Sequence, residues 1–408
     1  MSWQQKKLGD IADLLVGFAF KSQYFLNASE DGVRLVRGDN VQQGFLRWGD
    51  KAKKWNSAEF EDFRRYQLEK DDVLLAMDRP VVGGGLKLAW VKELDLPCLL
   101  VQRVTRIRGA ENLARTNFLR YVLSTPEFLG HIESVTTGAN IPHISGKDIA
   151  SFELKLPSLV EQDRIVEILS AYDELMDANI RRIELLEESA RLLYREWFVN
   201  LRFPGFEQAS LTNGLPDGWH IREVCSLVKF LNRGITPKYD ESAKGLVINQ
   251  KCIRGGRLSL KPARRQSKEV KPERLIQLGD ILINSTGAGT LGRVAQVRSQ
   301  IEDCTVDTHV TIARPSTPES ISFLGVALLE LEPTLSTMGV GSTNQLELGR
   351  TDIGAIKLRV PSAILQQEFH SRVWSLFEQV DTLAQTNELL AHARNEFLPK
   401  LISGAIQV

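Results

Sequence analysis

The chain repeats itself, and this repetition constrains its fold more than any other feature. The segment LEKDDVLLAM (68–77) has a counterpart in IQLGDILINS (276–285), and KDIASFELKLPS (147–158) has one in TDIGAIKLRVPS (351–362). Each copy opens at a tryptophan, with Trp3-Gln4-Gln5 in the first copy and Trp219-His220-Ile221 in the second. The three pairs of matching segments therefore occur in the same order in both copies. A period this long excludes a solenoid of short repeats and predicts one duplicated unit with two parts.

The first part of each unit contains short β-branched and apolar runs that are separated by Gly, Pro and Asp. The runs are VRLVRGDNV, DDVLLAM, LAWVKEL and FELKLP in the first copy, and GLVINQKCI, GDILINS, RVAQV and HVTIARP in the second. Such runs predict the strands of a mixed, mostly β domain. Apolar patterns over 116–131 and 322–331 predict some helix in each domain.

The second part of each unit predicts a long helix, because its apolar residues alternate four and three positions apart. An ordinary amphipathic helix on a globular core is the alternative. A 3.5-residue period drifts off one face of a straight helix over this length, so a coiled-coil pair is favoured. Asn179 and Asn387 fall on the seam, where a buried amide can fix the register, whereas Arg394 indicates an exposed or partnered end. The seam positions are Ile165, Leu169, Tyr172, Met176, Asn179, Ile183, Leu186, Ala190, Leu193 and Trp197, then Phe369, Val373, Leu376, Val380, Leu383, Asn387, Leu390, Arg394, Phe397 and Leu401.

The formal net charge is zero, but the charge is unevenly distributed. The two globular parts are net basic and the two helices are net acidic, and residues 229–274 hold thirteen basic residues against four acidic ones. A basic cluster of this density is typical of phosphate contact, although a solvated surface is the alternative. The residues that recur at short intervals in this cluster are Arg254, Arg257, Lys261, Arg264, Arg265, Lys268 and Lys271.

Several motifs of other protein classes are absent or out of context. The run 287–292 fits G-x-G-x-x-G, but the strand-like RVAQV follows it where a dinucleotide site needs a helix, so a glycine-rich hairpin is favoured. The sequence has no phosphate-binding G-x-x-x-x-G-K-[ST] motif and no Pro-Pro pair, which the catalytic tetrapeptide of an adenine methyltransferase requires. Asp72 and Asp280 match across the repeat just before a strand, where a turn or cap role is more probable than metal binding.

Neither the histidines nor the cysteines form a metal-ligand pattern. The six histidines include no HExxH motif, and the four cysteines have no CxxC spacing. We therefore expect buried, reduced thiols. The N-terminus has no apolar core of signal-peptide length, and no apolar run is long enough to span a membrane, so we expect a soluble, cytoplasmic protein.

Several segments resemble the DNA-specificity subunits of type I restriction–modification systems. LLYREWFVNLRFPGFE (192–207) with LPDGW (215–219) is similar to the way this family joins its first helix to its second half. LPSLVEQDRIVEILSAYDELMDANIRRIELLE (156–187) and FLPKLISGAI (397–406) resemble its helices. GFAFKSQYF (17–25), VRLVRGDNVQQG (33–44), GLVINQKCIRGGRLSL (245–260) and GDILINSTGAGTLGRVAQV (279–297) resemble its recognition domains.

The resemblance implies an α+β protein with an internal pseudo-two-fold repeat and two long antiparallel coiled-coil helices. The target-recognition domains would be residues 1–155 and 204–358, and the spacer helices would be residues 156–203 and 359–408. Each recognition domain would read one half of a bipartite target in double-stranded DNA, and the helices would set the spacing. The helices would also dock two modification subunits, which use S-adenosylmethionine to methylate adenine. Restriction subunits, with ATP and Mg²⁺, would join the same complex, and this chain would hold no cofactor and catalyse nothing.

Candidate DNA-binding residues are long polar side chains on loops. Their alternative role is backbone hydrogen bonding within the loop. In the first domain they are Lys21, Arg37, Asn40, Arg79, Gln102, Arg103 and Asn140, and in the second they are Lys238, Asn249, Lys251, Arg254, Ser285, Thr286, His309 and Asn344.

Two other classes of function compete with this prediction. A DNA-processing enzyme, such as a fused methyltransferase or nuclease, is disfavoured by the missing cofactor and catalytic motifs, and turnover by the isolated chain would reveal it. A structural adaptor that binds proteins through its duplicated domains is disfavoured by the basic cluster. A salt titration of DNA binding would distinguish it from a DNA reader.

Overall fold

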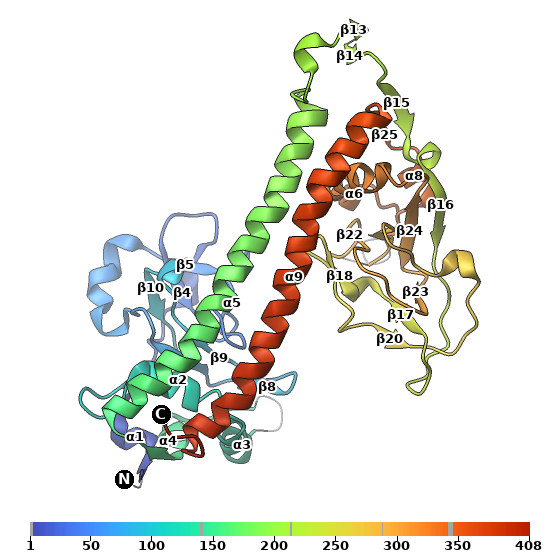
Figure 1. Cartoon of the computed structure of the whole chain (residues 1–408). Coiled ribbons are helices and arrows are strands. Elements are labelled where there is room, and N and C mark those ends of the chain that lie inside the picture. Colours follow the sequence, from blue (N-terminus) through green and yellow to red (C-terminus); the bar gives the residue numbers. More distant parts are fainter. Residues whose placement is uncertain (1–2, 139–141, 213, 288, 342–345) are drawn as a thin grey trace. The chain divides into compact units, whose positions relative to one another are not determined.

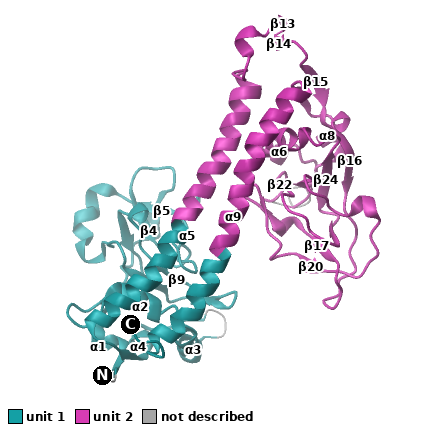
Figure 2. Ribbon diagram, in the orientation of Figure 1, with its two compact units in different colours: residues 1–177, 388–408 teal, residues 178–387 magenta. Residues whose placement is uncertain are grey.

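The protein is described here by a computed structural model, which covers residues 3–138, 142–212, 214–287, 289–341 and 346–408 (Figure 1). The chain forms two compact units (Figure 2). Unit 1 contains residues 1–177 and 388–408, and unit 2 contains residues 178–387. Each unit combines a globular part with stretches of the two long helices, α5 (Leu159–Tyr194) and α9 (Ala363–Ile402).

Unit 1 is built on a four-stranded antiparallel sheet in the order β2-β11-β6-β9. Its strands are β2 (Ala12–Val16), β6 (Val73–Ala76), β9 (Leu88–Trp90) and β11 (Val104–Gly109). A second sheet, in the order β10-β4-β5-β3, contains β3 (Leu26–Asn27), β4 (Val33–Val36), β5 (Lys53–Trp55) and β10 (Cys98–Leu100). The terminal strand β1 (Gln4–Lys7) pairs with β12 (Glu153–Leu156), and β7 (Val81–Val82) pairs with β8 (Gly85–Leu86).

The core of unit 1 forms where short helices pack on the first sheet. The helices are α1 (Leu8–Ile11), α2 (Thr116–Val122), α3 (Pro126–Val135) and α4 (Gly146–Ala150). Phe118 and Phe128 are buried together with Ile165 and Leu169 of α5. The helical structure that the sequence predicts over 116–131 is present as two helices, because Thr125 caps a new helix that has Pro126 in its first turn.

Unit 2 has a main sheet whose strand order matches that of unit 1, β16-β24-β21-β22. Its strands are β16 (Val228–Arg233), β21 (Ile281–Asn284), β22 (Val294–Gln296) and β24 (Val310–Pro315). The second sheet contains β17 (Leu246–Ile248), β20 (Arg264–Arg265) and β23 (Cys304–Val306). The pairs β13 (Leu211–Thr212) with β14 (Leu215–Pro216), β15 (His220–Glu223) with β25 (Lys357–Val360), and β18 (Ile253–Arg254) with β19 (Arg257–Leu258) complete the β structure.

The core of unit 2 is formed by α6 (Ser320–Glu330), which is buried along most of its length, and by apolar residues of both long helices. The helix predicted over 322–331 therefore exists. The short helices α7 (Glu332–Thr337) and α8 (Arg350–Gly354) follow α6. The 3₁₀ turns of the chain lie at Ser22–Tyr24, Ser57–Tyr66, Glu93–Asp95, Phe206–Gln208, Val224–Ser226, Gln250–Cys252 and Pro272–Arg274, and a π-helical turn at Arg195–Val199 extends α5.

The two long helices run antiparallel within unit 2. The Trp197 and Phe369 rings lie 5.8 Å apart, and Asn179 Nδ2 donates to Asn387 Oδ1 over 2.8 Å. Residue numbers therefore increase along α5 in the direction in which they decrease along α9. The pairing of these two seam amides is the contact expected of residues that fix the helix register. The seam prediction is confirmed at these positions.

The helix stretches of unit 1 are also antiparallel. The Tyr172 ring lies 6.4 Å from the Phe397 ring, and Arg394 Nη1 donates to Asp173 Oδ1 over 2.6 Å. Arg394 therefore has a charged partner, as its poor fit to an apolar seam indicated. Phe397 fits the seam prediction only in part, since its ring lies near Tyr172 but its side chain remains exposed.

The glycine-rich run 287–292 joins two antiparallel strands, β21 and β22, as the hairpin interpretation predicts. Gly292 has a φ of 77°, and a Cβ there would lie 2.4 Å from the backbone nitrogen of Ser336, so glycine is required by both conformation and space. Cys98, Cys252 and Cys304 are buried free thiols, but Cys225 is exposed, contrary to expectation. In the described parts of the chain, no helix is both long and apolar enough to cross a membrane.

Candidate nucleic-acid interface

Four loops of unit 1 meet at one end of its main sheet. They are residues 37–47, 77–87, 101–103 and the described parts of 136–144, which we call loop cluster 1. Backbone hydrogen bonds tie three of them together: Met77 N donates to Arg103 O (2.8 Å), Arg79 N to Pro142 O (2.7 Å) and Ile144 N to Met77 O (3.0 Å). In the fourth loop, 37–47, Gln43 Nε2 donates to Val82 O (2.6 Å). Because three of these loops follow buried strands and the fourth follows helix α3, their side chains are presented by a rigid scaffold.

The carboxylate of Asp78 lies at the centre of loop cluster 1. Arg103 Nη1 donates to its Oδ2 over 2.5 Å, and His143 Nδ1 lies 2.7 Å from its Oδ1. Partial burial would raise the pKa of Asp78, but the hydrogen bonds from Arg103 and His143 outweigh it and lower that pKa below its ordinary value. Asp78 is thus a carboxylate held between two donors. Neither it nor His143 was among the residues predicted from the sequence.

The structure places the predicted DNA-binding residues of the first domain in different environments. Arg37, Arg79, Gln102 and Arg103 lie in loop cluster 1, and Lys21 precedes the turn at Ser22–Tyr24 with its side chain exposed. Asn40 does not fit the prediction, because it is buried. Its Oδ1 accepts from Arg37 N, and its Nδ2 donates to Arg47 O. Asn40 therefore braces its loop, and Asn140 lies outside the described residues.

Equivalent loops of unit 2 meet in the same way. They are residues 248–258, 306–310 and the described parts of 284–294 and 338–348, which we call loop cluster 2. Ser285 N donates to His309 O (2.8 Å), Asp307 N to Ile248 O (2.9 Å) and Leu348 N to Ser285 O (2.9 Å). The bond from Ser285 to His309 repeats the bond from Met77 to Arg103, so these residues occupy matched positions in the two clusters.

The matched positions carry different chemistry. Asp78 forms a β-bridge with His143, and Thr286 forms one with Glu347. The counterpart of the Asp78–Arg103 pair is a hydrogen bond between Thr286 Oγ1 and His309 Nδ1 at 2.6 Å. Glu347 instead forms an ion pair with Arg233, at 2.6 Å. Loop cluster 1 thus presents a carboxylate between a guanidinium and an imidazole, where loop cluster 2 presents a hydroxyl, an imidazole and a carboxylate.

The predicted DNA-binding residues of the second domain also include both exposed and buried side chains. Thr286 and His309 lie in loop cluster 2, where Lys251 and Arg254 are exposed on the loop 248–258, and Lys238 is exposed on a neighbouring loop. Ser285 is buried, and its hydroxyl lies 2.5 Å from Thr311 Oγ1, which contradicts a base-reading role.

Asn249 uses both ends of its amide within the loop: Nδ2 donates to Pro262 O, and Oδ1 accepts from Lys251 N. It is a loop-bracing residue rather than an open donor. Asn344 lies outside the described residues.

Part of the basic cluster between residues 229 and 274 is used inside unit 2. Arg257 donates from Nε and Nη2 to the Glu187 carboxylate on α5, at 2.7 and 2.6 Å. Arg264 lies over the Tyr239 ring at 3.6 Å, and Arg265 donates to the Ala243 carbonyl. The expectation that the whole cluster contacts phosphate is therefore too broad. Arg254 and Lys271 are among its exposed members.

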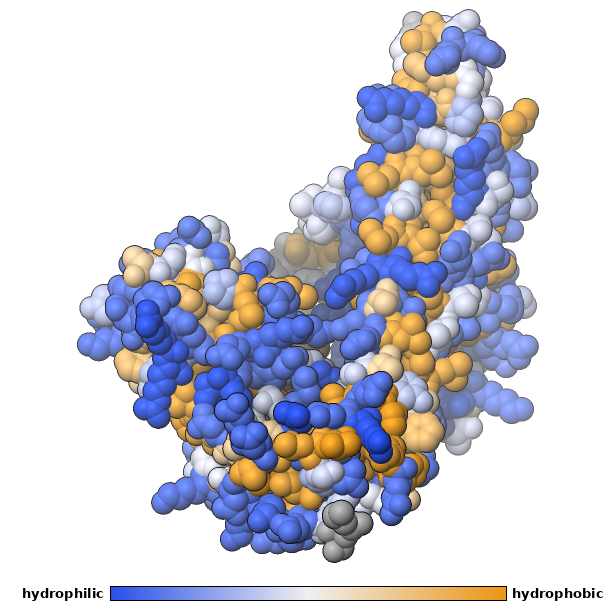
Figure 3. All heavy atoms as spheres, turned by 60° about the vertical axis from the view of Figure 1, so that its left-hand side comes forward, coloured by the Kyte–Doolittle hydropathy of each residue, from blue (hydrophilic) through white to orange (hydrophobic). Residues whose placement is uncertain are grey.

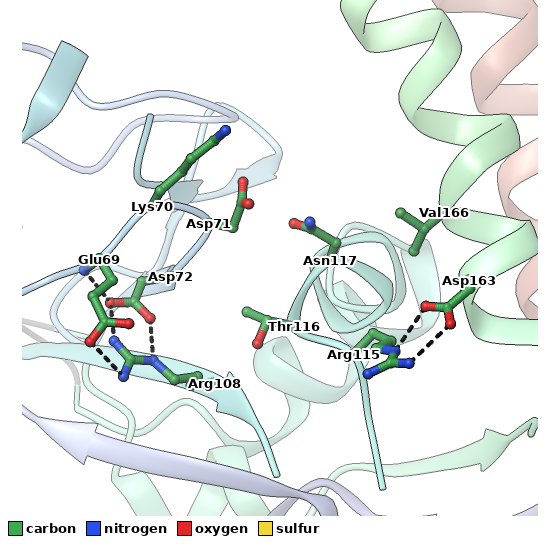
Figure 4. A pocket seen from close by; sticks show the side chains of 10 residues that line it. All are labelled: Glu69, Lys70, Asp71, Asp72, Arg108, Arg115, Thr116, Asn117, Asp163 and Val166. Carbon is green, nitrogen blue, oxygen red and sulfur yellow. Dashed lines mark hydrogen bonds and ion pairs between the residues drawn. The ribbon is translucent and has the colours of Figure 1, made fainter. Parts of the chain in front are cut away.

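A pocket of about 320 Å³ in unit 1 is lined by charged side chains (Figure 4). Its arginines are paired with its carboxylates: Arg108 Nε donates to Asp72 Oδ1 (2.7 Å), and Arg115 Nε donates to Asp163 Oδ1 (2.8 Å). Asp72 also accepts from Glu69 N, which confirms the turn role that the sequence predicts for it. Among the residues that the structure describes, no cluster of His, Cys, Asp or Glu could hold a metal ion.

Residues 1–188 match the family described as the type I restriction modification DNA specificity domain. The specificity subunit of the type I restriction enzyme EcoAI from Escherichia coli is 36% identical over 43% of this chain, but the match spans only 28% of that relative. The EcoBI specificity subunit of E. coli is 26% identical over 97% of this chain and 83% of its own length.

The fold is similar to that of a solved structure, the S subunit of a type I restriction–modification system from M. genitalium. The TM-score is 0.58 at 17% identity, and the similarity covers 98% of this chain and 96% of the other. Residues 1–188 are therefore assigned to the type I restriction modification DNA specificity domain, and the chain over nearly its full length is similar to curated specificity subunits of type I restriction enzymes.

Proposed function

We propose that this chain reads a bipartite DNA target, with one half-site per globular domain, and directs adenine methylation and restriction by partner subunits. The observation that carries the proposal is the contrast between the two loop clusters. They occupy matched positions on sheets of the same strand order, yet they present different polar groups. Two readers with one scaffold and different contact groups are suited to two different half-sites.

The domain organisation belongs to the same proposal. The recognition domains would be residues 1–155 and 204–358, and the spacer helices residues 156–203 and 359–408, related by an internal pseudo-two-fold repeat. The equal strand order of the two main sheets supports a duplication. The antiparallel contacts in each unit support a spacer made from both helices. The proposed length of the spacer in DNA then follows from the protein and not from the bases within it.

The proposed DNA-contacting residues are the predicted ones whose side chains are open in the loop clusters or beside them. Arg and Lys can bind phosphate or guanine, and Gln, Thr and His can bond to base edges. The set is Lys21, Arg37, Arg79, Gln102 and Arg103 in unit 1, and Lys238, Lys251, Arg254, Thr286 and His309 in unit 2.

Exposed apolar residues on α5 and its π-helical extension support a protein partner. In unit 2, Leu185, Leu192 and Val199 follow one another at intervals of one heptad, and all three are exposed. Apolar side chains also reach the surface among polar ones in Figure 3. An exposed apolar stripe on a helix is typical of a protein interface.

We propose that two modification subunits bind the helices and that restriction subunits join the complex. In this proposal the chain holds no cofactor. S-adenosylmethionine would be bound by the modification subunits, and ATP and Mg²⁺ by the restriction subunits.

Reconstitution with the cognate modification subunit tests the proposal. The purified chain alone should transfer no methyl group from S-adenosylmethionine to DNA, and the mixture should methylate one bipartite motif. A mixture with Leu192→Glu should lose activity, because a charge in the apolar stripe opposes docking. Arg64→Ala, in the turn Ser57–Tyr66, is the matched surface control. Methyl transfer by the isolated chain, or methylation by the partner without this chain, would contradict the proposal.

A salt titration of DNA binding by the assembled complex separates this function from that of a protein-binding adaptor. Phosphate contacts release counterions, so the affinity of a DNA reader should fall steeply with salt concentration. An adaptor would show weak DNA binding without sequence preference.

A further inference from the structure

Two arginines of loop cluster 1 have backbone conformations that L residues rarely adopt. Arg79 has a φ of 45°, and Arg103 has a φ of 67°. The turn that contains Arg103 is fixed on several sides, because Met77 N donates to Arg103 O and Gln102 N donates to Phe18 O. Strained residues that the surrounding structure holds in place are concentrated at functional sites. The conformation of Arg103 is therefore a reason to ask what its side chain contacts.

The Arg103 guanidinium is both exposed and oriented. Its side chain is 62% exposed, while Nη1 donates to Asp78 Oδ2 over 2.5 Å. His143 Nδ1 lies 2.7 Å from the other oxygen of the same carboxylate. A carboxylate that binds one edge of a guanidinium restricts its rotation and leaves further N–H donors for a ligand. The Arg103 guanidinium is thus held in a fixed orientation, with N–H donors free for a ligand, in the absence of that ligand.

We propose that Arg103 reads a guanine in the half-site bound by unit 1, and that Asp78 is the residue that positions its guanidinium. This inference rests on the proposed function and names the base that one residue recognises. Guanine presents O6 and N7 side by side in the major groove, and a guanidinium can donate to both at once. His143, fixed on the other oxygen of Asp78, keeps that carboxylate in place.

The competing role for Arg103 is phosphate binding, and Asp78 argues against it. The pKa of Asp78 lies below its ordinary value, so the carboxylate is ionised at neutral pH and would repel a phosphate beside Arg103. Arg79, whose side chain is exposed, is better suited to the phosphate backbone. A base edge carries no net charge, so the carboxylate does not repel it.

The test is the methylation pattern of full-length variants assembled with the modification subunit. Arg103→Ala should relax one guanine position of the first half-site and leave the second half-site strict. The preference for guanine at that position should fall roughly 5- to 150-fold, the range that one good bidentate contact provides. Arg103→Lys should relax the same position, because an ammonium cannot reproduce the paired donors of a guanidinium.

Asp78→Asn tests the positioning role. It keeps the shape of the side chain and removes its charge, so the guanine preference should fall at the same position but less than with Arg103→Ala. Arg64→Ala is the control, since Arg64 pairs with Glu61 outside loop cluster 1. Strict recognition of the second half-site by each variant shows that the complex is still assembled.

Each outcome decides between the alternatives. An unchanged motif with Arg103→Ala and Arg103→Lys would overturn the inference. A uniform loss of methylation at all sequences with Arg103→Ala, restored by Arg103→Lys and accompanied by a weaker salt dependence, would identify a phosphate contact instead. If the wild-type complex itself showed no bipartite motif, the proposed function would fail, whatever the variants did.

Discussion

Replacement of Asp280 by alanine should destabilise unit 2 strongly. The Asp280 carboxylate is fully buried and accepts from Arg314 Nε at 2.7 Å, Arg314 Nη2 at 2.8 Å and Gln277 N at 2.8 Å. Burial raises its pKa, and the Arg314 hydrogen bonds oppose that rise. The substitution leaves the Arg314 guanidinium, whose side chain is 7% exposed, without its counter-charge. Removal of one partner from a buried pair costs about 3–5 kcal/mol.

The equivalent pair in unit 1 supplies the matched comparison. Asp72 binds Arg108 in the same way, but the Arg108 side chain is 30% exposed and can be solvated when its partner is removed. Asp72→Ala should therefore cost less, about 1.5–3 kcal/mol, which is the range for a lost hydrogen bond to a charged group. Asp280→Asn should also cost less than Asp280→Ala, since the amide still accepts a hydrogen bond.

Hydrogen exchange measured by mass spectrometry in increasing urea shows which unit loses stability in each variant. Asp280→Ala should reduce the free energy of opening in peptides from β21 and β24 and leave those from β6 and β11 unchanged. Asp72→Ala should do the reverse, with a smaller effect. A loss below about 1 kcal/mol for Asp280→Ala, or equal losses for the two variants, would refute the reasoning from burial.

Three further predictions concern modularity, spacing and pH. Exchange of residues 1–150 for those of a relative should change one half-site in the methylation motif, and a change in both would contradict one domain per half-site. Insertion of one heptad after Glu184 keeps the seam phase and adds about 10.5 Å of helix, close to three base pairs at about 3.4 Å each, provided that α9 is lengthened to match. That variant should favour a longer gap, and methylation of the original gap at the wild-type level would contradict it. Partial burial lowers the pKa of His370 in the folded protein. As the pH falls below about 6.5, His370 therefore binds a proton in the unfolded chain before it does so in the folded chain. The free energy of unfolding of unit 2 should therefore fall from pH 7 to pH 5, and His370→Gln should flatten that slope in urea titrations, whereas an unchanged slope would exclude His370 as its source.

The strands and the helix seam could be predicted because they depend on local periodicity. The buried strand β6 is the apolar core of the run DDVLLAM, and β21 is that of GDILINS. The seam positions Asn179 and Asn387 were identified by their spacing alone, and they form a hydrogen bond. A turn role for Asp72 and Asp280 followed from their place before a strand, and both accept a backbone N–H three residues upstream.

Side-chain exposure within the loops could not be predicted in the same way, because it depends on contacts between distant segments. Asn40 and Ser285 are polar loop residues in sequence, yet tertiary packing buries both of them. The sequence places Arg257 among the predicted phosphate ligands, but in the structure it is paired with Glu187 of α5. Asp78 and His143 are far apart in sequence, and tertiary folding brings them together in a β-bridge and a side-chain contact. Comparison of positions 78 and 286 across the repeat was the one signal that could have identified that site.

A map of N6-methyladenine in the DNA of a host that carries the modification subunit, with and without this chain, tests the central claim most directly. With the chain, we expect methylation at a single motif of two defined half-sites separated by a gap of fixed length and free sequence. Without the chain, that methylation should disappear. Methylation that persists without the chain, or a motif that is continuous or has a gap of variable length, would contradict the proposal that this protein is a two-part DNA reader with a fixed spacing.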